Sequence, residues 1–399
     1  MKEETFVKDA SSYSAQGNAE PAYQTGFLRW RAAENGFSGW ALSGARLNAS
    51  GALELDPGAA KAESDPFPAG TYYSGNYYNG GTFFVGEATT PEIKTDFNYR
   101  ETIPSWNALT PTGAWLEIQF RARYGERWSK WYVLGIWASD DSTIRRHSVK
   151  DQGDGDGFVA ADTFISTNKE APSDTFQIKL RLFSADGSAS PVVRSASVAY
   201  STAKPASVSI SRGDPSRWNT LLDVLQCSQM VYPNGGNVWC SPTSLCMVLS
   251  YWDGYPGPRE ARVRSFVEGV FDWVYDGHGN WPFNAAFAAT LGYEGYIARL
   301  TGLERIEDLV AAGVPVITSI AWGKGELTGA DVESSDGHLM VVVGFDSAGN
   351  PIVNDSAAPG DESVQRSYLR TEFEPLWLRA SGGAVYLIYP PGTTVPAIP

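Results

Sequence analysis

Cys240 is the residue whose position best suits chemistry. It follows the turn-forming run Asn234-Gly-Gly and directly precedes a segment with helical spacing, 241–252. The positive end of a helix favours a thiolate over a thiol, so a cysteine placed there can act as a nucleophile. A small buried core cysteine is the competing interpretation, and for an arbitrary cysteine it is the more common one.

A nucleophilic cysteine also needs a base that takes its proton and a group that orients this base. Among the three histidines, His338 opens the apolar strand 339–345, and Asp355 closes the next apolar strand, 352–355. A hairpin through residues 346–351 would set the two strands side by side. Its register can bring the imidazole and the carboxylate together, which would hold the imidazole in the tautomer that accepts a thiol proton.

The other candidate groups are less specific. His147 lies beside Arg146 in the first half of the chain, and we interpret it as a structural residue at an exposed strand end. His278 lies in a Gly-rich loop and could reach a cleft, although no strand follows it that would carry an orienting group. Gln229 lies upstream of Cys240, where its side-chain amide could join the Cys240 backbone N–H in binding an oxyanion. A solvated loop glutamine is the alternative.

The first half of the chain has the pattern of strands. Residues 1–19 are polar and irregular, and apolar and polar residues then alternate over 116–121 and 176–182, as in half-buried strands. Residues 131–137 form a third, more buried strand. Turn clusters separate these strands, and no helix of normal length is predicted between them. We therefore predict an antiparallel β-sandwich or jelly roll over 20–203.

The second half has a different pattern. Residues 204–217 contain Pro, Ser and Gly and predict a linker, after which an α+β domain is predicted over 218–392. Helices are expected first and an antiparallel sheet later. The predicted helices span 241–252, 259–275, 284–291 and 303–312, and the predicted strands span 314–321, 339–345, 351–354 and 384–389.

The first predicted helix is expected to hold Cys240 in place. One buried face is predicted by the spacing i, i+3, i+4 and i+7 of Leu245, Val248, Leu249 and Trp252. Pro242 suits the first turn, and Ser241 or Thr243 can cap it. Cys246 lies six positions after Cys240, about 240° further round the helix, and is predicted to face away from the site.

Four elements of the second half occur in the order of a known family. They are Gln229, Trp239-Cys-Ser-Pro-Thr-Ser244, Asp336-Gly-His-Leu-Met-Val-Val-Val-Gly-Phe345 and Val353-Asn-Asp-Ser-Ala-Ala358. Over about 217–390 the chain resembles the papain-fold cysteine peptidases related to the bacteriocin-processing, double-glycine peptidases. It is most similar to stand-alone bacterial members that carry an N-terminal β-domain. The resemblance implies Cys240 as nucleophile and His338 as general base. It also implies Asp355 as the orienting group and Gln229 as oxyanion donor.

The sequence departs from the family pattern in two places. The segment 230–239 is longer than the family's usual spacing, and Ser241 follows the cysteine where many relatives have Gly. The bacteriocin processors also sit on transporters. No membrane-spanning or nucleotide-binding segment is predicted here, so cleavage of double-glycine leaders does not carry over.

Three aromatic or imidazole side chains are candidates for a substrate cleft. They are Trp239, His278 and Trp281. The stretch Asn280-Trp-Pro-Phe-Asn284 resembles the same stand-alone relatives, and Trp281 could wall the cleft. Packing of the helix that follows is the alternative, and we favour it slightly.

Two motifs in the first half remain outside this chemistry. The segment with Asp151, Asp154 and Asp156 resembles an acidic calcium loop but lacks the final Glu of an EF-hand, which favours a solvated hairpin turn. The run Ser105-Trp-Asn107 and the pairs Tyr72-Tyr73 and Tyr77-Tyr78 could bind sugars or peptide. Aromatic pairs in a β-sandwich are more often part of the core.

Composition narrows the classes of partner. A net charge of −14 argues against nucleic acid or an anionic membrane, because both attract clustered Lys and Arg. No transmembrane run of about 18 apolar residues is present in the sequence. The aromatic content of 13% favours β-rich architecture or carbohydrate-facing surfaces. Three cysteines, an odd number, cannot form a closed disulfide framework, so they do not fix the compartment. A Cys227–Cys246 disulfide after export is left open.

We therefore predict thiol-dependent hydrolysis of a peptide or amide bond through a thioester acyl-enzyme, with a peptide or protein as substrate. One alternative is a papain-fold acyltransferase that uses the same residues. Another is a non-catalytic protein whose β-domain binds polysaccharide or a cell surface. No metal or cofactor is expected. An exported bacterial protein whose signal peptide has been removed is expected, with a cytosolic protein as the alternative.

Overall fold

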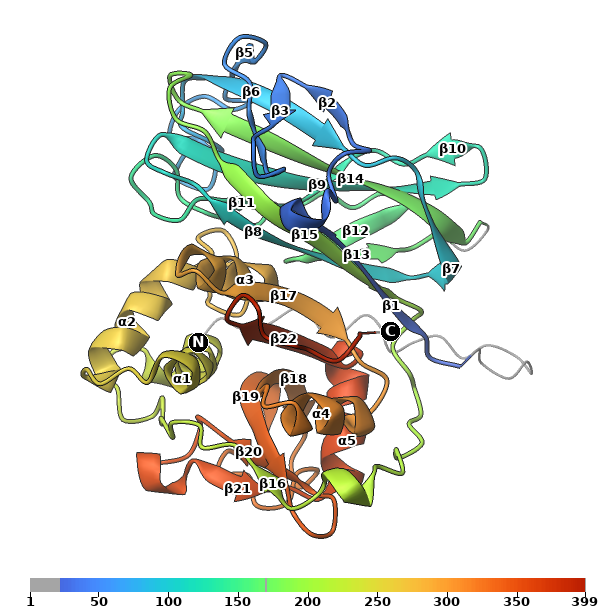
Figure 1. The fold of residues 1–399 in the computed structure, drawn as a ribbon, viewed down its shortest axis with the longest axis vertical. Coiled ribbons are helices and arrows are strands. Elements are labelled where there is room, and N and C mark those ends of the chain that lie inside the picture. The colour runs from blue at the N-terminus through green and yellow to red at the C-terminus, as the bar shows by residue number, and fades with distance from the viewer. Residues whose placement is uncertain (1–21, 169–170, 399) are drawn as a thin grey trace.

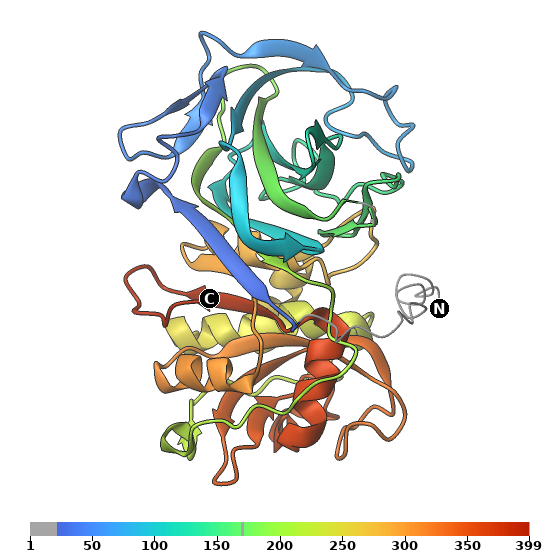
Figure 2. The ribbon, with the colours of Figure 1, turned by 90° about the vertical axis from the view of Figure 1, so that its right-hand side faces the viewer.

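The protein is described by a computed structural model that covers residues 22–168 and 171–398. Figures 1 and 2 show a body of strands stacked on a second body in which helices surround a sheet. The predicted irregular segment at 1–19 lies outside the described residues. Within the described ranges, no helix is long and apolar enough to cross a membrane.

The first body is built of antiparallel strands. They are β1 (Thr25–Arg31), β2 (Ala41–Ser43), β3 (Ala45–Leu47), β4 (Leu53–Leu55), β5 (Lys61–Ser64), β6 (Thr82–Thr89), β7 (Ile93–Tyr99), β8 (Glu101–Leu109), β9 (Ala114–Tyr124), β10 (Arg127–Trp128), β11 (Tyr132–Trp137), β12 (Gly157–Ala160), β13 (Thr163–Ser166), β14 (Ser173–Ser184) and β15 (Val192–Ser201). One sheet has the order β12-β13-β8-β15-β4-β3, with β1 on β15. The other has the order β10-β9-β14-β6-β2, with β11 on β9, β5 on β6 and β7 on β14.

The two sheets enclose a shared apolar core. Ile118 of β9 lies opposite Leu180 of β14, and both side chains are buried against Trp106 and Val198 of the other sheet. The alternating residues point the other way, which is the period-2 pattern of a sheet with one core face. The three strands predicted from the sequence are confirmed, and the sandwich with them. Between residues 22 and 201, the described helical structure is one 3₁₀ turn, Ala32–Glu34.

The second body contains one antiparallel sheet and five α-helices among the described residues. The helices are α1 (Cys240–Asp253), α2 (Arg259–Val270), α3 (Trp281–Thr290), α4 (Leu303–Ala311) and α5 (Arg370–Ser381). The strands are β16 (Thr220–Leu221), β17 (Glu294–Arg299), β18 (Val316–Trp322), β19 (Ser335–Phe345), β20 (Pro351–Asn354), β21 (Gln365–Ser367) and β22 (Ala384–Tyr389). Their order is β17-β22-β18-β19-β20-β21, with β16 on β19.

Two predicted helix boundaries are wrong for identifiable local reasons. α2 ends at Val270 rather than at 275, because the Asp272 carboxylate accepts the backbone amides of Val274 and Tyr275 and turns the chain into a loop. α3 begins earlier than residue 284, because the Asn280 side chain caps it by accepting from the Phe283 amide at 3.2 Å.

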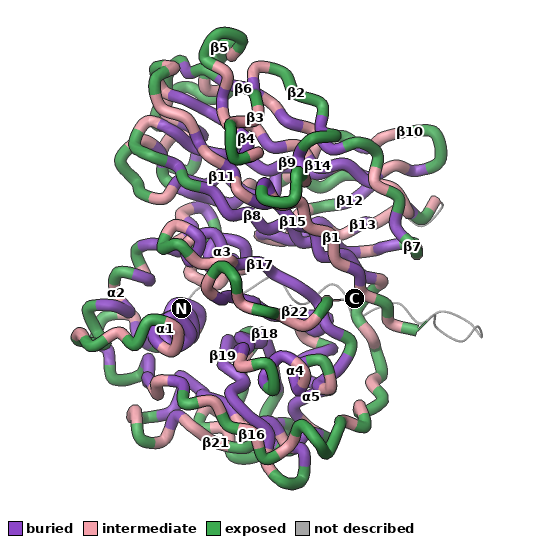
Figure 3. The backbone as a smooth tube through the Cα atoms, in the orientation of Figure 1, coloured by how far each residue is buried: buried purple, intermediate pink, exposed green. Residues whose placement is uncertain are grey.

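A buried polar seam joins the two bodies along β8 and β17. The Asn107 side-chain amide donates to the Gly295 carbonyl at 2.6 Å, and the Ile297 amide donates to the Ser105 hydroxyl at 2.8 Å. Arg299 and Glu101 form an ion pair whose side chains are 1% and 8% exposed. Figure 3 shows buried backbone on both sides of this junction. Ser105 and Asn107, considered above as ligand-binding residues, therefore serve the junction.

Candidate active site

Cys240 is the first residue of α1, and its side chain is half-buried. The first helical hydrogen bond runs from the Thr243 amide to the Trp239 carbonyl at 3.0 Å. Pro242 lacks an N–H, so the amides of Cys240 and Ser241 are the first-turn donors left for a ligand. The start of α1 thus presents a thiol beside two backbone donors.

The predicted cap of this helix is wrong. Because α1 begins at Cys240, Ser241 and Thr243 lie inside its first turn rather than before it. The Ser241 hydroxyl instead pairs with the Tyr386 hydroxyl at 3.0 Å, and the Thr243 hydroxyl has no hydrogen-bond partner among the described residues. Deeper in the helix, Ser244 donates to the Leu339 carbonyl at 3.0 Å, which fixes α1 against β19.

His338 and Asp355 are in direct contact. β19 pairs with β20 with Val341 opposite Asn354, as the predicted hairpin requires. The His338 Nε2 lies 2.8 Å from Asp355 Oδ1. Because Nε2 faces the carboxylate, Nδ1 is the ring nitrogen left to face Cys240.

Asp355 is fully buried and held by further donors. The Ala357 amide donates to Oδ1 at 2.9 Å, and the Tyr368 hydroxyl donates to Oδ2 at 2.7 Å. Tyr368 was not among the residues singled out from the sequence, because β21 brings it to Asp355 from another strand. The Trp322 and His338 rings also meet nearly at right angles with their centroids 5.6 Å apart, and Trp322 was not singled out from the sequence either.

The charges of this pair reinforce one another. Burial alone would lower the pKa of His338, but the Asp355 carboxylate and a contact with the Cys240 side chain raise it to about 10. Burial alone would raise the pKa of Asp355, but the His338 imidazolium and the Tyr368 hydroxyl hold it well below its usual range. At neutral pH His338 is therefore an imidazolium and Asp355 a carboxylate.

Gln229 is buried and tied to the residue that follows Asp355. Its backbone amide donates to the Ser356 carbonyl at 2.8 Å, and the Ser356 hydroxyl donates to its Oε1 at 2.7 Å. These two bonds orient the side chain so that its NH₂ group points away from Ser356. Ser356 was missed because its role depends on this contact between distant segments.

The long segment 230–239 folds back onto Gln229. A Cβ at Gly236 would overlap the Gln229 carbonyl oxygen, so only glycine allows this approach. A 3₁₀ turn, Gly236–Val238, then leads directly to Cys240. The extra length therefore forms a loop that starts and ends beside Gln229.

The three candidate cleft residues lie near the start of α1 and α3. Trp239 is buried, and its ring meets the His278 ring edge-on at 6.5 Å. Burial lowers the pKa of His278 to about 4, so its imidazole is neutral at pH 7. The Trp281 amide donates to the Asp162 carboxylate of the first body at 2.7 Å, and its ring packs on the core around α1. Cleft roles for these residues stay predictions.

His147 lies in a different place from that predicted. Its side chain is fully buried rather than exposed, with ring nitrogens 2.8 Å from the Tyr77 and Ser148 carbonyls. The reason is a β-bridge to Ile136, which draws the loop onto the face of the sheet. It lies far along the chain from the other histidines and serves the packing of the first body.

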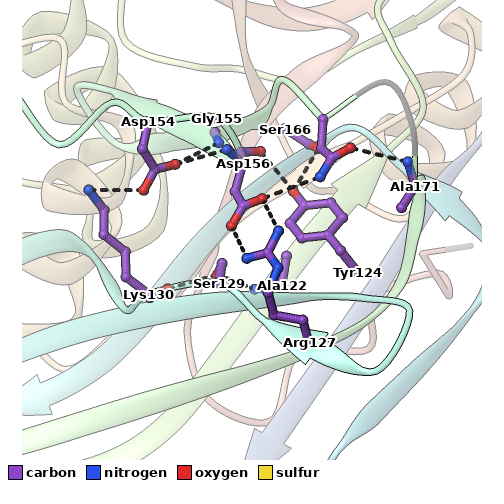
Figure 4. A network of polar contacts seen from close by, with 12 residues as sticks. Ala122, Tyr124, Arg127, Ser129, Lys130, Asp154, Gly155, Asp156, Ser166 and Ala171 are labelled. Atoms are coloured by element: carbon purple, nitrogen blue, oxygen red, sulfur yellow. Dashed lines mark hydrogen bonds and ion pairs between the residues drawn. The ribbon is translucent and has the colours of Figure 1, made fainter.

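The acidic loop at 151–157 is neutralised by its own neighbours (Figure 4). Arg127 forms two hydrogen bonds to Asp156, at 2.6 and 2.7 Å, and Lys130 pairs with Asp154 at 3.2 Å. Asp154 also accepts the Asp156 amide. The predicted solvated turn is thus partly wrong, because Asp156 is buried in an ion pair. In the described parts of the chain, no cluster of three or more His, Cys, Asp or Glu is arranged to hold a metal ion.

The other two cysteines are buried free thiols. The Cys227 sulfur lies 3.0 Å from the Tyr232 hydroxyl, and burial raises the pKa of Cys227 to about 11. Burial likewise raises the pKa of Cys246 to about 12. The Cys246 side chain, within α1, packs in the core against the buried side of this helix, in agreement with its predicted orientation. These two thiols are therefore poor nucleophiles.

Both bodies match known family models. Residues 26–201 match the peptidase C39 N-terminal domain, and residues 221–385 match the peptidase C39-like family. The chain combines a peptidase C39 N-terminal domain with a C39-like domain. These matches support a cysteine peptidase-like function. The narrower resemblance to bacteriocin-processing members stays a prediction.

Two solved structures are similar to part of the chain. TmCBM61 in complex with beta-1,4-galactotriose shares 9% identity at a TM-score of 0.20, over 41% of this chain and 88% of that one. A structure of carbohydrate-binding modules from the beta-sandwich superfamily shares 9% identity at a TM-score of 0.19, over 44% of this chain and 56% of that one. No curated protein matches the chain.

Proposed function

We propose that this C39 protein is a cysteine peptidase that hydrolyses a peptide or amide bond with Cys240 as its nucleophile. The observation that carries the proposal is the buried contact between His338 and Asp355 beside a cysteine at a helix start. An imidazolium and a helix N-terminus both stabilise a thiolate. The C39-like match over 221–385 supports the same assignment.

In the proposed reaction the Cys240 thiolate attacks the substrate carbonyl carbon, and its proton resides on the His338 imidazole. The Cys240 backbone N–H and the Gln229 side-chain NH₂ bind the oxyanion of the tetrahedral intermediate. His338 then protonates the leaving amine as the C–N bond breaks, which leaves a thioester. His338 next takes a proton from water as the oxygen attacks the thioester, and the C–S bond breaks to release the acid product and restore the Cys240 thiolate beside the His338 imidazolium.

Asp355 does not gain a proton in this scheme. Its carboxylate accepts the Nε2–H of His338 and keeps Nδ1 directed at the sulfur. Tyr368 and the Ala357 amide fix the carboxylate in turn. Ser356 fixes the oxyanion donor through the Gln229 Oε1.

Turnover of a peptide library, read by mass spectrometry, tests the proposal. The full chain should cleave a subset of peptides, and Cys240→Ala should abolish cleavage with an unchanged circular dichroism spectrum. Cys227→Ser is the matched control, because a serine hydroxyl can keep the contact with Tyr232. Cleavage that persists in Cys240→Ala would reject the mechanism. Added amine separates hydrolysis from acyl transfer, since a transferase would yield the amide of that amine.

A further inference from the structure

A groove lies on the outer face of the sheet that contains β9 and β14. The loop between β5 and β6 folds over this face, and its Tyr72, Tyr77 and Tyr78 rings are buried in a small core of their own, as the core interpretation predicted. A cavity of about 380 Å³ lies between the loop and the sheet, and a second, of about 440 Å³, lies between the loop and the segment with Lys150 and Asp151. Phe67, Tyr72 and Lys150 line both, so the cavities form one groove.

The floor of the groove consists of planar polar side chains that hold one another in place. Glu117 on β9 is 1% exposed and accepts from the Gln119 amide at 2.7 Å and from the Tyr78 hydroxyl. Arg181 on β14 lies 3.6 Å from Glu117 and pairs with Glu63 at 2.6 Å. Burial outweighs this arginine and raises the pKa of Glu117. Such a network is preorganised for hydrogen bonding to a polar ligand.

The rim of the groove carries exposed aromatic rings. Phe67 is 42% exposed and Tyr73 is 46% exposed, although both have large aromatic side chains whose burial would be favourable. Tyr73 (φ 47°), Ser74 (φ 65°) and Asp151 (φ 60°) adopt left-handed backbone conformations that non-glycine residues rarely take. The Tyr73 hydroxyl donates to the Asp151 carboxylate at 2.9 Å, which joins the two strained segments across the second cavity. Strain of this kind concentrates at functional sites.

We propose that this groove binds an oligosaccharide chain. A sugar ring presents an apolar C–H face that stacks on an aromatic ring, and hydroxyl groups that pair with carboxylate, amide and guanidinium groups. Phe67 and Tyr73 supply the rings, and Gln119 and Arg181, held in place by the buried Glu117, supply the partners. The two adjoining cavities, of about 380 and 440 Å³, leave room for more than one sugar ring. The groove suits a peptide less well. A peptide that binds by strand addition needs a free backbone edge, whereas the floor of this groove is the side-chain face of a sheet.

The groove also lies beside the C39-like domain. The Tyr72 ring is 6.3 Å from the Trp273 ring, and a Cβ at Gly75 would meet the same ring at 2.6 Å. The binding experiment therefore uses the full chain, so that the loop keeps its neighbour. The proposal does not depend on peptidase activity, and Cys240→Ala protein can be used throughout.

An array of immobilised hexasaccharides (cello-, xylo-, manno-, galacto- and chitohexaose), with casein peptides as the comparison, tests the proposal. At least one hexasaccharide should bind, and isothermal titration with that sugar should show an affinity about tenfold weaker for Tyr73→Ala and for Phe67→Ala. Gln119→Ala, which removes a floor donor, should weaken binding too.

Phe158→Ala is the matched control, because Phe158 is 36% exposed on β12 of the other sheet. It should bind the sugar as the parent chain does. An array on which no sugar binds would overturn the proposal, and so would binding that the groove variants leave unchanged. Peptide binding that is lost in the groove variants would show that the groove takes a peptide instead.

Discussion

The Tyr368→Phe substitution should lower the free energy of unfolding, and the size of this loss should depend on pH in the acid range. The substitution removes the hydroxyl that donates to Asp355 Oδ2 at 2.7 Å and leaves a fully buried carboxylate with one donor fewer. A hydrogen bond to a charged group contributes about 1.5–3 kcal/mol, and we expect a loss of this size in the free energy of unfolding at pH 7. The aromatic ring remains, so no large cavity forms.

The pH dependence follows from the direction of the pKa shift. The folded-state pKa of Asp355 lies well below its ordinary value, so its stabilising contribution is present above about pH 4 and is lost as the pH falls. The difference between the parent and Tyr368→Phe should therefore stay constant down to about pH 4 and shrink only at more acidic pH, where the Asp355 carboxylate of the folded variant takes up a proton. Asp355 remains a carboxylate at neutral pH with or without the Tyr368 hydroxyl, so the pKa of His338 and the basic limb of kcat/KM should stay close to those of the parent.

Urea unfolding between about pH 2 and pH 8 measures the first effect, and the pH profile of kcat/KM measures the second. Tyr251→Phe is the matched control, because it also removes one hydroxyl, which donates to the neutral Gly313 carbonyl at 3.1 Å. Its cost should be about 1 kcal/mol and independent of pH. A loss in Tyr368→Phe that is no larger than in this control, or that has already vanished at about pH 5, would show that the Tyr368 hydroxyl does not stabilise a buried carboxylate.

Two further predictions concern other parts of the molecule. Gln229→Ala should lower kcat by about 10²–10³ with a smaller change in KM, because an oxyanion donor acts in the transition state; unchanged kcat in steady-state assays would exclude that role. Arg299→Met should destabilise the chain by about 3–5 kcal/mol in urea unfolding, because it leaves Glu101 buried and unpaired at the junction of the two domains. The double variant with Glu101→Leu should recover much of that loss, and a failure to recover would show that the ion pair is not the cause.

The sequence predicts the central pair because the pair depends on local geometry. His338 and Asp355 belong to one hairpin, and strand period together with hairpin pairing is enough to bring them close. The position of Cys240 can also be predicted from the sequence, since a turn followed by helical spacing marks the start of α1. The roles of Tyr368 and Ser356 cannot be predicted from the sequence, because their contacts depend on how β21 and the Gln229 segment pack in three dimensions.

Other errors have similar causes. α5 was not predicted, because Pro375 inside it interrupts the helical pattern and tertiary packing compensates for this. β17 was not predicted either; its Gly295 is unfavourable in a strand but allows close approach to α3, because a Cβ there would lie 2.7 Å from the Ala285 carbonyl oxygen. The arginines beside His147 favour an exposed position. Arg146 is nevertheless buried, and its guanidinium group donates hydrogen bonds to the Ala138 and Glu268 carbonyls.

The central claim is that Cys240 is a nucleophile activated by His338, and the pH dependence of its alkylation tests this most directly. Iodoacetamide labelling followed by mass spectrometry reads each thiol separately, and buried Cys227 and Cys246 serve as internal controls. If His338 activates Cys240, labelling of Cys240 should be fast already at pH 6, this rate should be lost in His338→Ala, and the other two thiols should be labelled slowly throughout. Labelling of Cys240 at the rate and pH dependence of an ordinary exposed thiol, unchanged in His338→Ala, would contradict the claim.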